Sequence, residues 1–455
     1  MALVTKAIKG TQDTLPGESS KLRFLETTIS DIATSYGFRE IRTPVFEHTE
    51  LFNRSVGDTT DVVQKEMYTF EDKGGRSITL RPEGTAGAVR SFLENGLFNE
   101  PSPYKVFYHT SCYRYEKPQA GRLREFHQFG VECFGTQSPA EDAEVIALAD
   151  EIFNFLGVKD LELEINSIGC PCCRPKYQAA LKEYFEQNKD QLCETCLERL
   201  DRNPMRIIDC KVESDELKDG APVVLDYLCD ECNEHFEDLK SYLEAMNIEY
   251  KVNPRIVRGL DYYTKTVFEF VSTSIGAQGT VCGGGRYDGL CEELGGKPTP
   301  ALGFGMGMER LQLLLKAQGI ELPEEEPCSL YIASAGKEGT VKAAAIAHDL
   351  RAEGVFCMFD TVGRSIKAQM KFANKIGAEF VVVIGSDELN TGKAELKEMQ
   401  TGKTQIINLE TLAEDFSDIA IKASVSKFAD EFAGTDLEGV DLGNIDLNSL
   451  MGGNF

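Results

Sequence analysis

Four arginines stand in polar or glycine-rich segments of the chain, where their side chains could bind a phosphorylated substrate. Arg114 and Arg122 belong to a polar segment over residues 112–135. Arg258 opens the motif Arg-Gly-Leu-Asp-Tyr-Tyr, and Arg310 closes the run Gly-Phe-Gly-Met-Gly-Met-Glu-Arg. A guanidinium can bind phosphate oxygens through two parallel hydrogen bonds. Together with nearby carboxylates and glycines, the four arginines suit a site for a nucleoside triphosphate.

The polar segment 112–135, and a second one around Glu83, also allow a simpler explanation. Pro118 and Gly121 mark a turn, so the segment 112–135 could be a charged hairpin on the surface. Glu83 lies in the segment Arg-Pro-Glu-Gly-Thr-Ala. Its carboxylate could bind a substrate ammonium group, or it could cap a helix over residues 86–93.

Other catalytic patterns do not occur in the sequence. The glycine-rich turn expected over 279–288 lacks the Lys-Ser/Thr ending of a P-loop and the spacing of a dinucleotide motif. Its glycines therefore favour close approach of the backbone to a ligand. The five histidines have no metal-ligand spacing among themselves, and no Gly-x-Ser-x-Gly nucleophile motif occurs. We expect each histidine to lie on the surface or to be hydrogen-bonded in the core.

Eight of the fourteen cysteines fall between residues 169 and 249. Six of them form three Cys-x-x-Cys pairs, at Cys170/Cys173, Cys193/Cys196 and Cys229/Cys232. The second and third pairs, about 32 residues apart, are compatible with a tetrahedral Zn²⁺ site. Cys210 and His235 are further candidate ligands. Free buried thiols explain the pattern as well, and a redox pair is a third explanation.

The hydrophobic pattern predicts the elements that would position these side chains. Apolar residues at helical spacing predict a helix over 141–156, and alternation predicts strands over 161–165 and 266–271. Residues 319–327 are typical of a linker. After the linker, strands alternate with helices, which predicts a small domain with a largely parallel sheet. The strands are expected over 329–333, 355–359 and 380–384, and the helices over 341–351 and 365–376.

The composition is that of a large globular protein. The 455 residues are 42% hydrophobic and 27% charged, and the length predicts about three domains. No apolar stretch reaches the roughly 18 residues of a membrane span, and the start has no signal or transit pattern, so we expect a cytoplasmic protein. The net charge of −26 argues against a protein that coats nucleic acids. It still allows a nucleic-acid enzyme with local basic patches.

Taken in order, the motifs resemble those of the histidyl-tRNA synthetases, a class II aminoacyl-tRNA synthetase family. The resemblance extends to about residue 415. The histidine-specific segments are Arg258–Tyr263 and Gly283–Asp288. Four further segments are similar to the opening of the family and to the three class II motifs, namely Lys9–Pro16, Tyr36–Pro44, Tyr113–Gly135 and Ala301–Leu311.

The resemblance implies an α/β and α+β multidomain fold. Its parts would be an antiparallel-sheet catalytic core, an inserted subdomain and a C-terminal α/β anticodon-binding domain. The core is expected over 1–168 and 250–320, the cysteine-rich acidic insertion over 169–249, the anticodon-binding domain over 328–420, and a disordered acidic tail over 421–455.

The resemblance also implies the reaction and its residues. L-Histidine would be activated by ATP with Mg²⁺ to histidyl-adenylate and transferred to the 3′ end of histidine tRNA by a homodimer. Arg114 and Arg258 would be the catalytic residues. The implied ATP-binding residues are Arg114, Glu116, Arg122, Phe126 and Arg310. The implied histidine-binding residues are Glu83, Thr85, Gln128, Glu132, Arg258, Tyr262, Tyr263 and Tyr287. The implied tRNA-binding residues are Gln119, Arg364, Lys367 and Lys371. A zinc ion on Cys193, Cys196, Cys229 and Cys232 would be structural.

The main alternative is the regulatory subunit of ATP phosphoribosyltransferase, a non-catalytic relative of this core. That protein lacks the anticodon domain, and it tends to lose the arginine and tyrosine that stand here as Arg258 and Tyr263. A non-enzymatic tRNA-binding protein is a third possibility, which would require loss of the ATP arginines. We expect neither a membrane nor DNA as a partner.

Overall fold

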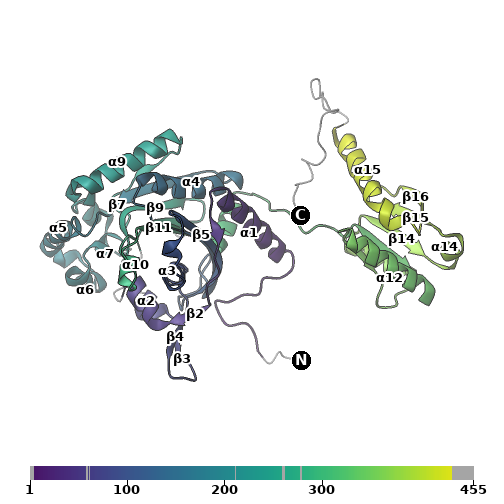
Figure 1. Cartoon of the computed structure of the whole chain (residues 1–455), viewed down its shortest axis with the longest axis horizontal. Helices are drawn as coiled ribbons and strands as arrows, with labels where there is room; N and C mark the ends of the chain where they lie inside the picture. The colour runs from purple at the N-terminus through teal and green to yellow at the C-terminus, as the bar shows by residue number, and fades with distance from the viewer. Residues whose placement is uncertain are drawn as a thin grey trace. The chain divides into compact units, whose positions relative to one another are not determined.

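The structure, a computed structural model, describes residues 5–57, 60, 62–210, 212–258, 262–276 and 279–432. The chain forms two compact units, Met1–Glu324 and Glu325–Phe455, which are drawn in Figure 1. Within the described ranges, none of the helices has the length and hydropathy that a bilayer crossing requires. Residues Gly259–Asp261 of the histidine-specific motif lie outside the described residues.

An eight-stranded sheet forms the centre of the first unit, with the strand order β1-β5-β6-β11-β10-β9-β7-β8. All pairings from β5 to β7 are antiparallel, whereas the edge pairings β1–β5 and β7–β8 are parallel. This arrangement confirms the predicted antiparallel core. The strands are β1 (Arg39–Glu40), β5 (Tyr104–Tyr113), β6 (Glu125–Phe134), β7 (Leu161–Ser167), β8 (Lys251–Val252), β9 (Thr264–Ser272), β10 (Thr280–Arg286) and β11 (Ala301–Gly307).

Four helices cover one face of this sheet. They are α1 (Glu18–Ser35), α4 (Pro139–Phe155), α9 (Asp230–Ala245) and α11 (Met308–Ala317). Their apolar residues share a core with alternate side chains of β6, such as Phe129 and Val131. Helix α4 starts where the Ser138 hydroxyl accepts the Ala140 N–H (3.3 Å), with Pro139 in the first turn. The helix predicted over 141–156 is thereby confirmed, and Figure 1 shows α4 beside α9.

The other face of the sheet packs against a second core that includes most of the insertion. The insertion is helical, with α5 (Arg174–Gln187), α6 (Glu194–Arg202), α7 (Met205–Ile208), α8 (Asp215–Asp219) and the short 3₁₀ turns Lys189–Gln191 and Val224–Tyr227. Helices α3 (Thr85–Glu94) and α10 (Leu290–Glu293) lie on this side as well. A small sheet, β2-β4-β3, stands next to α2 (Thr49–Val56) and the π-helical turn Val62–Glu66. Its strands are β2 (Phe46–His48), β3 (Thr69–Glu71) and β4 (Ser77–Leu80).

The second unit is a five-stranded sheet with helices, as the alternation predicted. Its order is β13-β12-β14-β15-β16. The pairs β12–β13 and β12–β14 are parallel, but β14–β15 and β15–β16 are antiparallel, so the sheet is mixed where we expected it to be largely parallel. The elements are β12 (Leu330–Ser334), α12 (Gly336–Ala352), β13 (Cys357–Phe359), α13 (Ile366–Lys375), β14 (Phe380–Ile384), α14 (Ser386–Thr391), β15 (Lys393–Glu398), β16 (Thr404–Asn408) and α15 (Leu412–Phe432).

Helix α15 differs from the expected boundary between domain and tail. It continues to Phe432, past the predicted tail start at residue 421. Leu412 and Phe416 anchor its first turns in the core of the unit. Residues 433–455 of the predicted tail lie outside the described residues.

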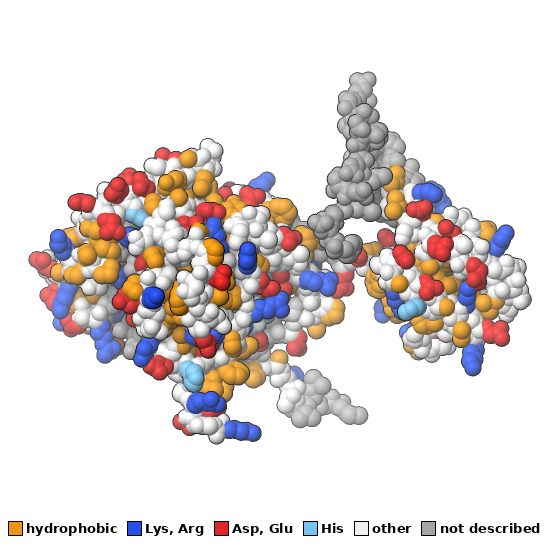
Figure 2. All heavy atoms as spheres, viewed as in Figure 1, with side chains coloured by type: hydrophobic (Ala, Val, Ile, Leu, Met, Phe, Trp, Pro, Cys, Tyr) orange, Lys and Arg blue, Asp and Glu red, His pale blue; other side chains and the backbone are white. Residues whose placement is uncertain are grey.

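Acidic and basic side chains are interspersed on the face of the molecule that Figure 2 displays, in both units. With 74 Asp and Glu against 48 Lys and Arg, an anionic ligand needs local positive charge. The arrangement of the arginines therefore decides where such a ligand can bind.

Candidate active site

One cavity of about 240 Å³ collects every residue that the sequence predicted for ATP and histidine binding. It lies on the sheet face opposite α1 and α4, and β6, β10 and β11 supply part of its wall. The predicted residues in its lining are Glu83, Thr85, Arg114, Glu116, Arg122, Phe126, Gln128, Glu132, Arg258, Tyr262, Tyr263, Tyr287 and Arg310.

The alternation of strand β6 explains why its polar residues face this cavity. Successive side chains of a strand point to opposite faces, so Gln128 and Glu132 share one face while Phe129 and Val131 pack into the core. Burying one face with apolar groups therefore fixes the direction of the polar ones.

Glycines in the neighbouring strand β11 leave room for those polar side chains. Gly303 is paired with Glu132, and a Cβ added to Gly303 would lie 2.2 Å from Glu132 Oε2. A Cβ on Gly305 would lie 2.3 Å from Gln128 Nε2. The Gly-x-Gly-x-Gly run thus keeps the cavity floor open. The sequence showed the run, but not which side chains occupy the space.

Glu132 is the most confined carboxyl in the cavity. The Tyr108 hydroxyl donates to its Oε1 (2.8 Å), and the Tyr287 hydroxyl donates to its Oε2. Burial raises the pKa of Glu132 to about 8, although hydrogen bonds from Tyr287, Thr85 and Tyr108 act in the opposite direction. Sequence reasoning missed Tyr108. Its ring fits between Gly84 and Gly130, where an added Cβ atom would collide with it, and no signal in the sequence reveals this fit.

Glu83 performs the structural role that the sequence left open for it. Its carboxylate accepts the backbone N–H of Thr85 (2.6 Å) and of Ala86 (2.8 Å), so it caps α3. Glu83 also lines the cavity. Burial raises the pKa of Glu83 above its ordinary value, against the two backbone N–H groups that lower it. The cap and a ligand-binding role are therefore compatible in one side chain.

Two of the predicted arginines, Arg258 and Arg310, are held by Glu269 and Thr280, which are hydrogen-bonded to each other. Arg258 forms an ion pair with Glu269, whose other oxygen accepts the Thr280 hydroxyl (2.9 Å). Arg310 donates to the Thr280 carbonyl (2.6 Å). Glu269 and Thr280 were not predicted, and they set the separation of the two guanidinium groups. Burial alone would lower the pKa of Arg258, but the Glu269 carboxylate raises it above the ordinary value.

The hairpin β5–β6 supplies the other two arginines, as the sequence predicted. Arg114 donates to the Pro82 carbonyl (2.8 Å), and its guanidinium carbon lies 5.3 Å from the centre of the Phe126 ring. Arg122 lies 3.4 Å from a Glu116 oxygen. Burial, and next the positive charge of Arg122, lower the pKa of Arg310. This end of the cavity is therefore electropositive and would be stabilised by an anion.

A histidine that the sequence left unassigned ties this hairpin to α11. His127 Nδ1 lies 2.8 Å from Glu309 Oε1, and its backbone N–H donates to the same carboxylate (2.9 Å). The hydrogen bond to Glu309 raises the pKa of His127. Because Glu309 precedes Arg310, this contact fixes the first turn of the helix that carries Arg310.

The predicted tRNA residues lie in two other places. Gln119 lines a neighbouring hollow of about 760 Å³, which shares Gly121 and Glu309 with the cavity. Lys367 and Lys371 are exposed on α13 in the second unit. Arg364 precedes this helix and pairs with Asp360 (2.7 Å), so it does not continue the helical row that the spacing suggested.

The glycine-rich segment over 279–288 is mostly a strand, not the predicted turn. Residues Thr280–Arg286 form β10 between β9 and β11. A Cβ on Gly283 would lie 2.6 Å from Arg258 Nη1. This glycine therefore admits a guanidinium against the strand, where the sequence suggested close approach of a ligand.

The cysteine pairs do not combine as the sequence predicted. Cys193 and Cys196 lie with Cys210 and Glu213, whereas Cys229 and Cys232 lie with Cys170 and Cys173. The predicted set is wrong because Cys170 and Cys173, and not Cys193 and Cys196, lie against Cys229 at the N-terminus of α9. His235 belongs to neither set. It is buried, and its Nε2 lies 2.8 Å from Asp142 Oδ2.

Comparison with known proteins agrees with these features. The family model described as histidyl-tRNA synthetase matches residues 10–311, and the model described as anticodon binding domain matches residues 329–419. Among curated relatives, a histidine–tRNA ligase of Acetivibrio thermocellus is 54% identical over 90% of this chain and 99% of its own length. One from Caldanaerobacter subterraneus is 56% identical over 89% and 98%.

Solved structures resemble the chain in fold as well. The crystal structure of apo S. aureus histidyl-tRNA synthetase is 41% identical, with a TM-score of 0.79 over 91% of this chain and all of that one. A Bacillus halodurans structure described as an ATP phosphoribosyltransferase regulatory subunit/histidyl-tRNA synthetase is 21% identical, with a TM-score of 0.61 over 85% of this chain and all of that one. At that identity the likeness concerns the fold alone.

Proposed function

The chain belongs to the histidyl-tRNA synthetase family, and from that membership we propose how its cavity carries out the reaction of a histidine–tRNA ligase. The reaction activates L-histidine with ATP and then transfers the histidyl group to tRNA. The observation that carries the assignment of residues is that all thirteen predicted side chains line one cavity.

The end of the cavity around Glu132 would bind histidine. An imidazole presents one N–H donor and one acceptor nitrogen, so it needs an acceptor and a donor from the protein. We assign the acceptor to Glu132 and the donor to the Tyr263 hydroxyl, with Tyr262 and Tyr287 beside them. Glu83, Thr85 and Gln128 would hold the substrate ammonium group. Of the three, Glu83 is the one with a carboxylate, and Thr85 and Gln128 offer neutral hydrogen-bond acceptors from the same cavity wall.

The electropositive end would bind ATP. Phe126 would stack on adenine and Glu116 would accept from its amino group. Arg114 and Arg258 would hold the α-phosphate side, and Arg310 with Arg122 the γ-phosphate. The lowered pKa of Arg310, caused by burial and by Arg122, supports an anionic ligand at this end. Mg²⁺ accompanies the triphosphate as part of the substrate.

The chemistry needs positioning and charge stabilisation more than covalent help from the protein. An oxygen of the histidine carboxylate attacks the α-phosphorus. A bond from that oxygen to phosphorus forms while the bond to the bridging oxygen breaks, and pyrophosphate leaves. Charge that accumulates on the α-phosphate oxygens would be stabilised by Arg114 and Arg258. The 3′-terminal hydroxyl of the tRNA then attacks the histidyl carbonyl and AMP leaves.

Selection of histidine would follow from the same polar groups. Glu132 is 1% exposed and holds two phenols. An apolar amino acid could not form the hydrogen bonds that the imidazole is proposed to make with Glu132 and Tyr263, and sites of this type discriminate by about 10⁴–10⁵-fold. The site therefore would need no separate editing step.

Binding of tRNA and dimerisation complete the proposal. Gln119 would approach the acceptor end from the hollow beside the cavity, and Lys367, Lys371 and Arg364 would contact the anticodon region. A homodimer would form through the segment that begins at Tyr36. Val45 and Phe46, which follow this segment, are 42% and 55% exposed and would offer apolar surface to a second copy.

The regulatory paralogue is not favoured. Relatives at 54% and 56% identity over about nine-tenths of the chain are histidine–tRNA ligases, and the anticodon-binding domain is present over residues 329–419. Arg258 and Tyr263 both stand in the cavity.

Histidine-dependent exchange of pyrophosphate into ATP tests the proposal. Wild-type protein should show exchange that requires histidine, and Arg258→Ala should abolish it in protein that is still folded at the assay temperature, although loss of the ion pair with Glu269 lowers its unfolding temperature. Arg76→Ala is the matched control, because Arg76 pairs with Asp72 (2.7 Å) on an exposed hairpin and does not line the cavity. Folded wild-type protein without exchange would refute the function. Near-normal exchange by Arg258→Ala would refute the role of Arg258.

A further inference from the structure

Seven cysteines and one glutamate of the insertion form two separate four-residue groups. The first group, called here the inner cluster, is Cys170, Cys173, Cys229 and Cys232. The second group, the outer cluster, is Cys193, Cys196, Cys210 and Glu213. Within each cluster all four candidate ligand atoms lie within 4.8 Å of one another.

The sulfur separations in both clusters fit the edge of a tetrahedron around one metal ion. Cys170 Sγ lies 3.6 Å from Cys173 Sγ and 3.9 Å from Cys229 Sγ. Cys193 Sγ lies 3.9 Å from Cys210 Sγ. A tetrahedral Zn²⁺ with Zn–S bonds of about 2.3 Å places neighbouring sulfurs about 3.8 Å apart. A disulfide would bring two sulfurs to about 2.05 Å, and all these cysteines are free.

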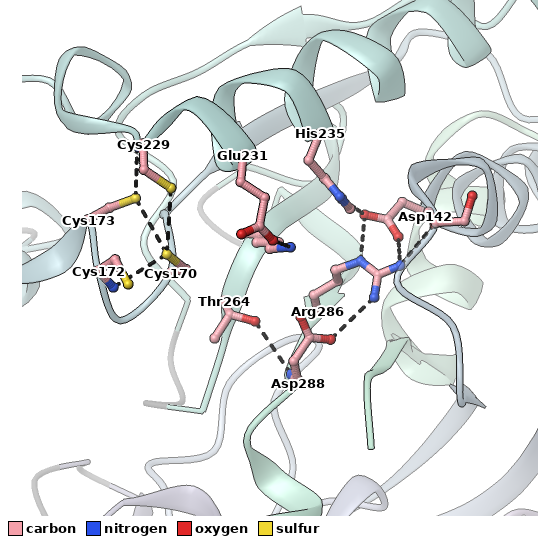
Figure 3. Close-up of polar contacts among 12 residues, drawn as sticks. Asp142, Cys170, Cys172, Cys173, Cys229, Glu231, His235, Thr264, Arg286 and Asp288 are labelled. Atoms are coloured by element: carbon pink, nitrogen blue, oxygen red, sulfur yellow. Dashed lines mark hydrogen bonds and ion pairs between the residues drawn. The ribbon is translucent and has the colours of Figure 1, made fainter. Parts of the chain in front are cut away.

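Local structure presents the sulfurs of the inner cluster to one point. Cys229 is the N-cap of α9 and Cys232 lies one turn later, so both sulfurs project from the same helix start. The Cys229 N–H donates to Cys173 Sγ (3.1 Å), and the Cys172 N–H donates to Cys170 Sγ (3.4 Å). Donors directed at sulfur favour the thiolate, which is the form that binds metals. Figure 3 shows Cys170, Cys173 and Cys229 pointing toward one another.

The outer cluster repeats the arrangement with a carboxylate in the fourth position. Cys193 is the N-cap of α6, and Cys196 lies in its first turn. Glu213 is only 6% exposed, although carboxylates are rarely buried without a partner. Its Oε1 accepts the Cys193 N–H (2.9 Å), so the carboxylate is fixed against the cluster. Three thiolates and one carboxylate are an acceptable closed set for Zn²⁺.

We propose that the insertion binds two structural zinc ions, one in the inner and one in the outer cluster. Sulfur-rich, four-coordinate sites select zinc or iron among the common metals. A single ion fits the spacing, whereas an iron–sulfur cluster needs its cysteines spread around several metal atoms. The outer ion connects α6 to the segment after α7, and the inner ion connects α9 to the segment before α5.

The two ions have different consequences for the cavity. The segment of the inner cluster is bonded to the start of β9, because Ile168 N–H donates to the Lys265 carbonyl (2.8 Å) and Lys265 N–H donates to the Gly169 carbonyl (2.9 Å). Arg174, next to Cys173, donates to the carbonyl of Tyr263. Tyr263 lines the cavity. The inner ion therefore supports the histidine end of the cavity.

Helix α9 provides a second connection from the inner cluster to the catalytic sheet. Figure 3 shows Glu231, Thr264, Asp142, Arg286, Asp288 and His235 in this region. Glu231 forms an ion pair with Lys265 (2.7 Å). His235 bonds to Asp142, which pairs with the fully buried Arg286 in β10. These contacts attach the start of α9 to strands β9 and β10 of the catalytic sheet. The outer cluster lies among α6, α7 and α8, within the insertion itself.

Metal analysis of the purified full-length protein tests the proposal. Elemental analysis should find about two zinc ions per chain. They should be retained through purification, because structural zinc sites hold the metal tightly. Cys232→Ser and Cys196→Ser should each lower the content by one, and the double variant should lose both. Cys172→Ser is the matched control, since Cys172 is adjacent to the inner cluster but exposed and outside it. It should keep both ions.

The connection to Tyr263 predicts a split in kinetics, which rests on the proposed function. In pyrophosphate exchange, Cys232→Ser should raise KM for histidine by about tenfold, because small displacements of positioning groups are costly. Cys196→Ser should leave KM within about twofold, since its ion is not bonded to the cavity wall. Equal effects of the two variants would overturn the connection while leaving the metal sites.

Wild-type protein decides the metal question even where a variant fails to fold. Fewer than about 0.2 zinc per chain in the wild type, against the tight binding of structural sites, would overturn both sites. Iron in place of zinc, seen by elemental analysis and by colour, would overturn the choice of metal. Because zinc content is measured without substrates, it stands independently of the enzyme assay. Zinc-loaded protein without histidine-dependent exchange would refute the function and not the metal sites.

Discussion

Replacement of Glu132 by glutamine removes a charge at the histidine end of the cavity and preserves its shape. Glu132 accepts hydrogen bonds from Tyr108 and Tyr287 and is assigned to accept one from the substrate imidazole. Glutamine keeps one carbonyl acceptor and replaces the other oxygen by an NH₂ group. The variant therefore loses the charged acceptor and forces one phenol to turn its hydrogen elsewhere.

The size of the effect follows from the strength of the lost hydrogen bond. A hydrogen bond to a charged acceptor contributes about 1.5–3 kcal/mol, which corresponds to roughly 10–150-fold in kcat/KM for histidine. The full effect applies only when Glu132 is ionised in the free enzyme. Its pKa of about 8, raised by burial, means that about 10% is ionised at pH 7 and about 90% at pH 9.

The pH dependence therefore has a definite sign. The ratio of wild-type to Glu132→Gln kcat/KM should rise between pH 7 and pH 9, because the wild-type carboxylate becomes available as pH passes its pKa. Ionisations of histidine itself affect both proteins equally and cancel in the ratio. A ratio that stays constant or falls over this range would refute the assignment of Glu132 as the charged acceptor.

Thermal unfolding provides the control that the variant is folded. The difference in unfolding temperature between the variant and the wild type also has a definite dependence on pH. The folded pKa of about 8 lies above the ordinary value of 4.5. Below about pH 4.5 the carboxyl is protonated in both states and its contribution to stability is complete. As pH rises toward 8, the unfolded state ionises first and the wild type loses stability. Glu132→Gln should therefore gain in unfolding temperature relative to the wild type across this window.

Two further substitutions test the floor of the cavity and the tRNA surface. Gly303→Ala would place a Cβ 2.1 Å from the Val131 carbonyl and 2.2 Å from Glu132 Oε2. It should abolish exchange and lower stability by about 1–3 kcal/mol in denaturant unfolding, whereas Gly289→Ala, whose Cβ meets open space, should do neither. An active Gly303→Ala enzyme would show that the floor tolerates a side chain. Lys371→Glu should leave exchange unchanged but weaken tRNA binding. The slope of the logarithm of the tRNA binding constant against the logarithm of the salt concentration should become less steep by about 1, because one phosphate contact is lost. Lys337→Glu is the exposed control in the same unit; equal losses in both variants would contradict a specific contact at Lys371.

Much of the active site could be predicted because its residues fall in ordered motifs. The helix over 141–156 and the strands over 161–165 and 266–271 follow from periodicity, and the structure contains all three. The carboxylates and arginines follow from the family resemblance, and they meet in one cavity. What remained hidden are residues that act through another residue, such as Tyr108, Glu269 and Glu309. Nothing in their local sequence distinguishes a tyrosine that holds Glu132 from one that packs in a core.

The mixed sheet of the second unit shows a limit of a different kind. Periodicity identified β12, β13 and β14, whose apolar residues are buried or half-buried. In the added hairpin, β15 alternates exposed and buried residues, whereas Ile407 is the one buried residue of the edge strand β16. The exposed residues of β15 are charged, so in the sequence this strand resembles a surface loop, because only one of its faces carries apolar residues.

The cysteine clusters show why spacing alone cannot assign ligands. Three similar Cys-x-x-Cys pairs permit several pairings, and distance along the chain favoured the wrong one. The pairing is set by packing, because α9 returns to the catalytic sheet through Asp142 and His235 and carries Cys229 and Cys232 to the segment that enters the insertion. Cys193 and Cys196 remain inside the insertion and find Cys210 and Glu213 instead. The same return of α9 fixes the first cluster beside Tyr263. The zinc ion proposed for the inner cluster would therefore also support the end of the cavity that is proposed to bind histidine.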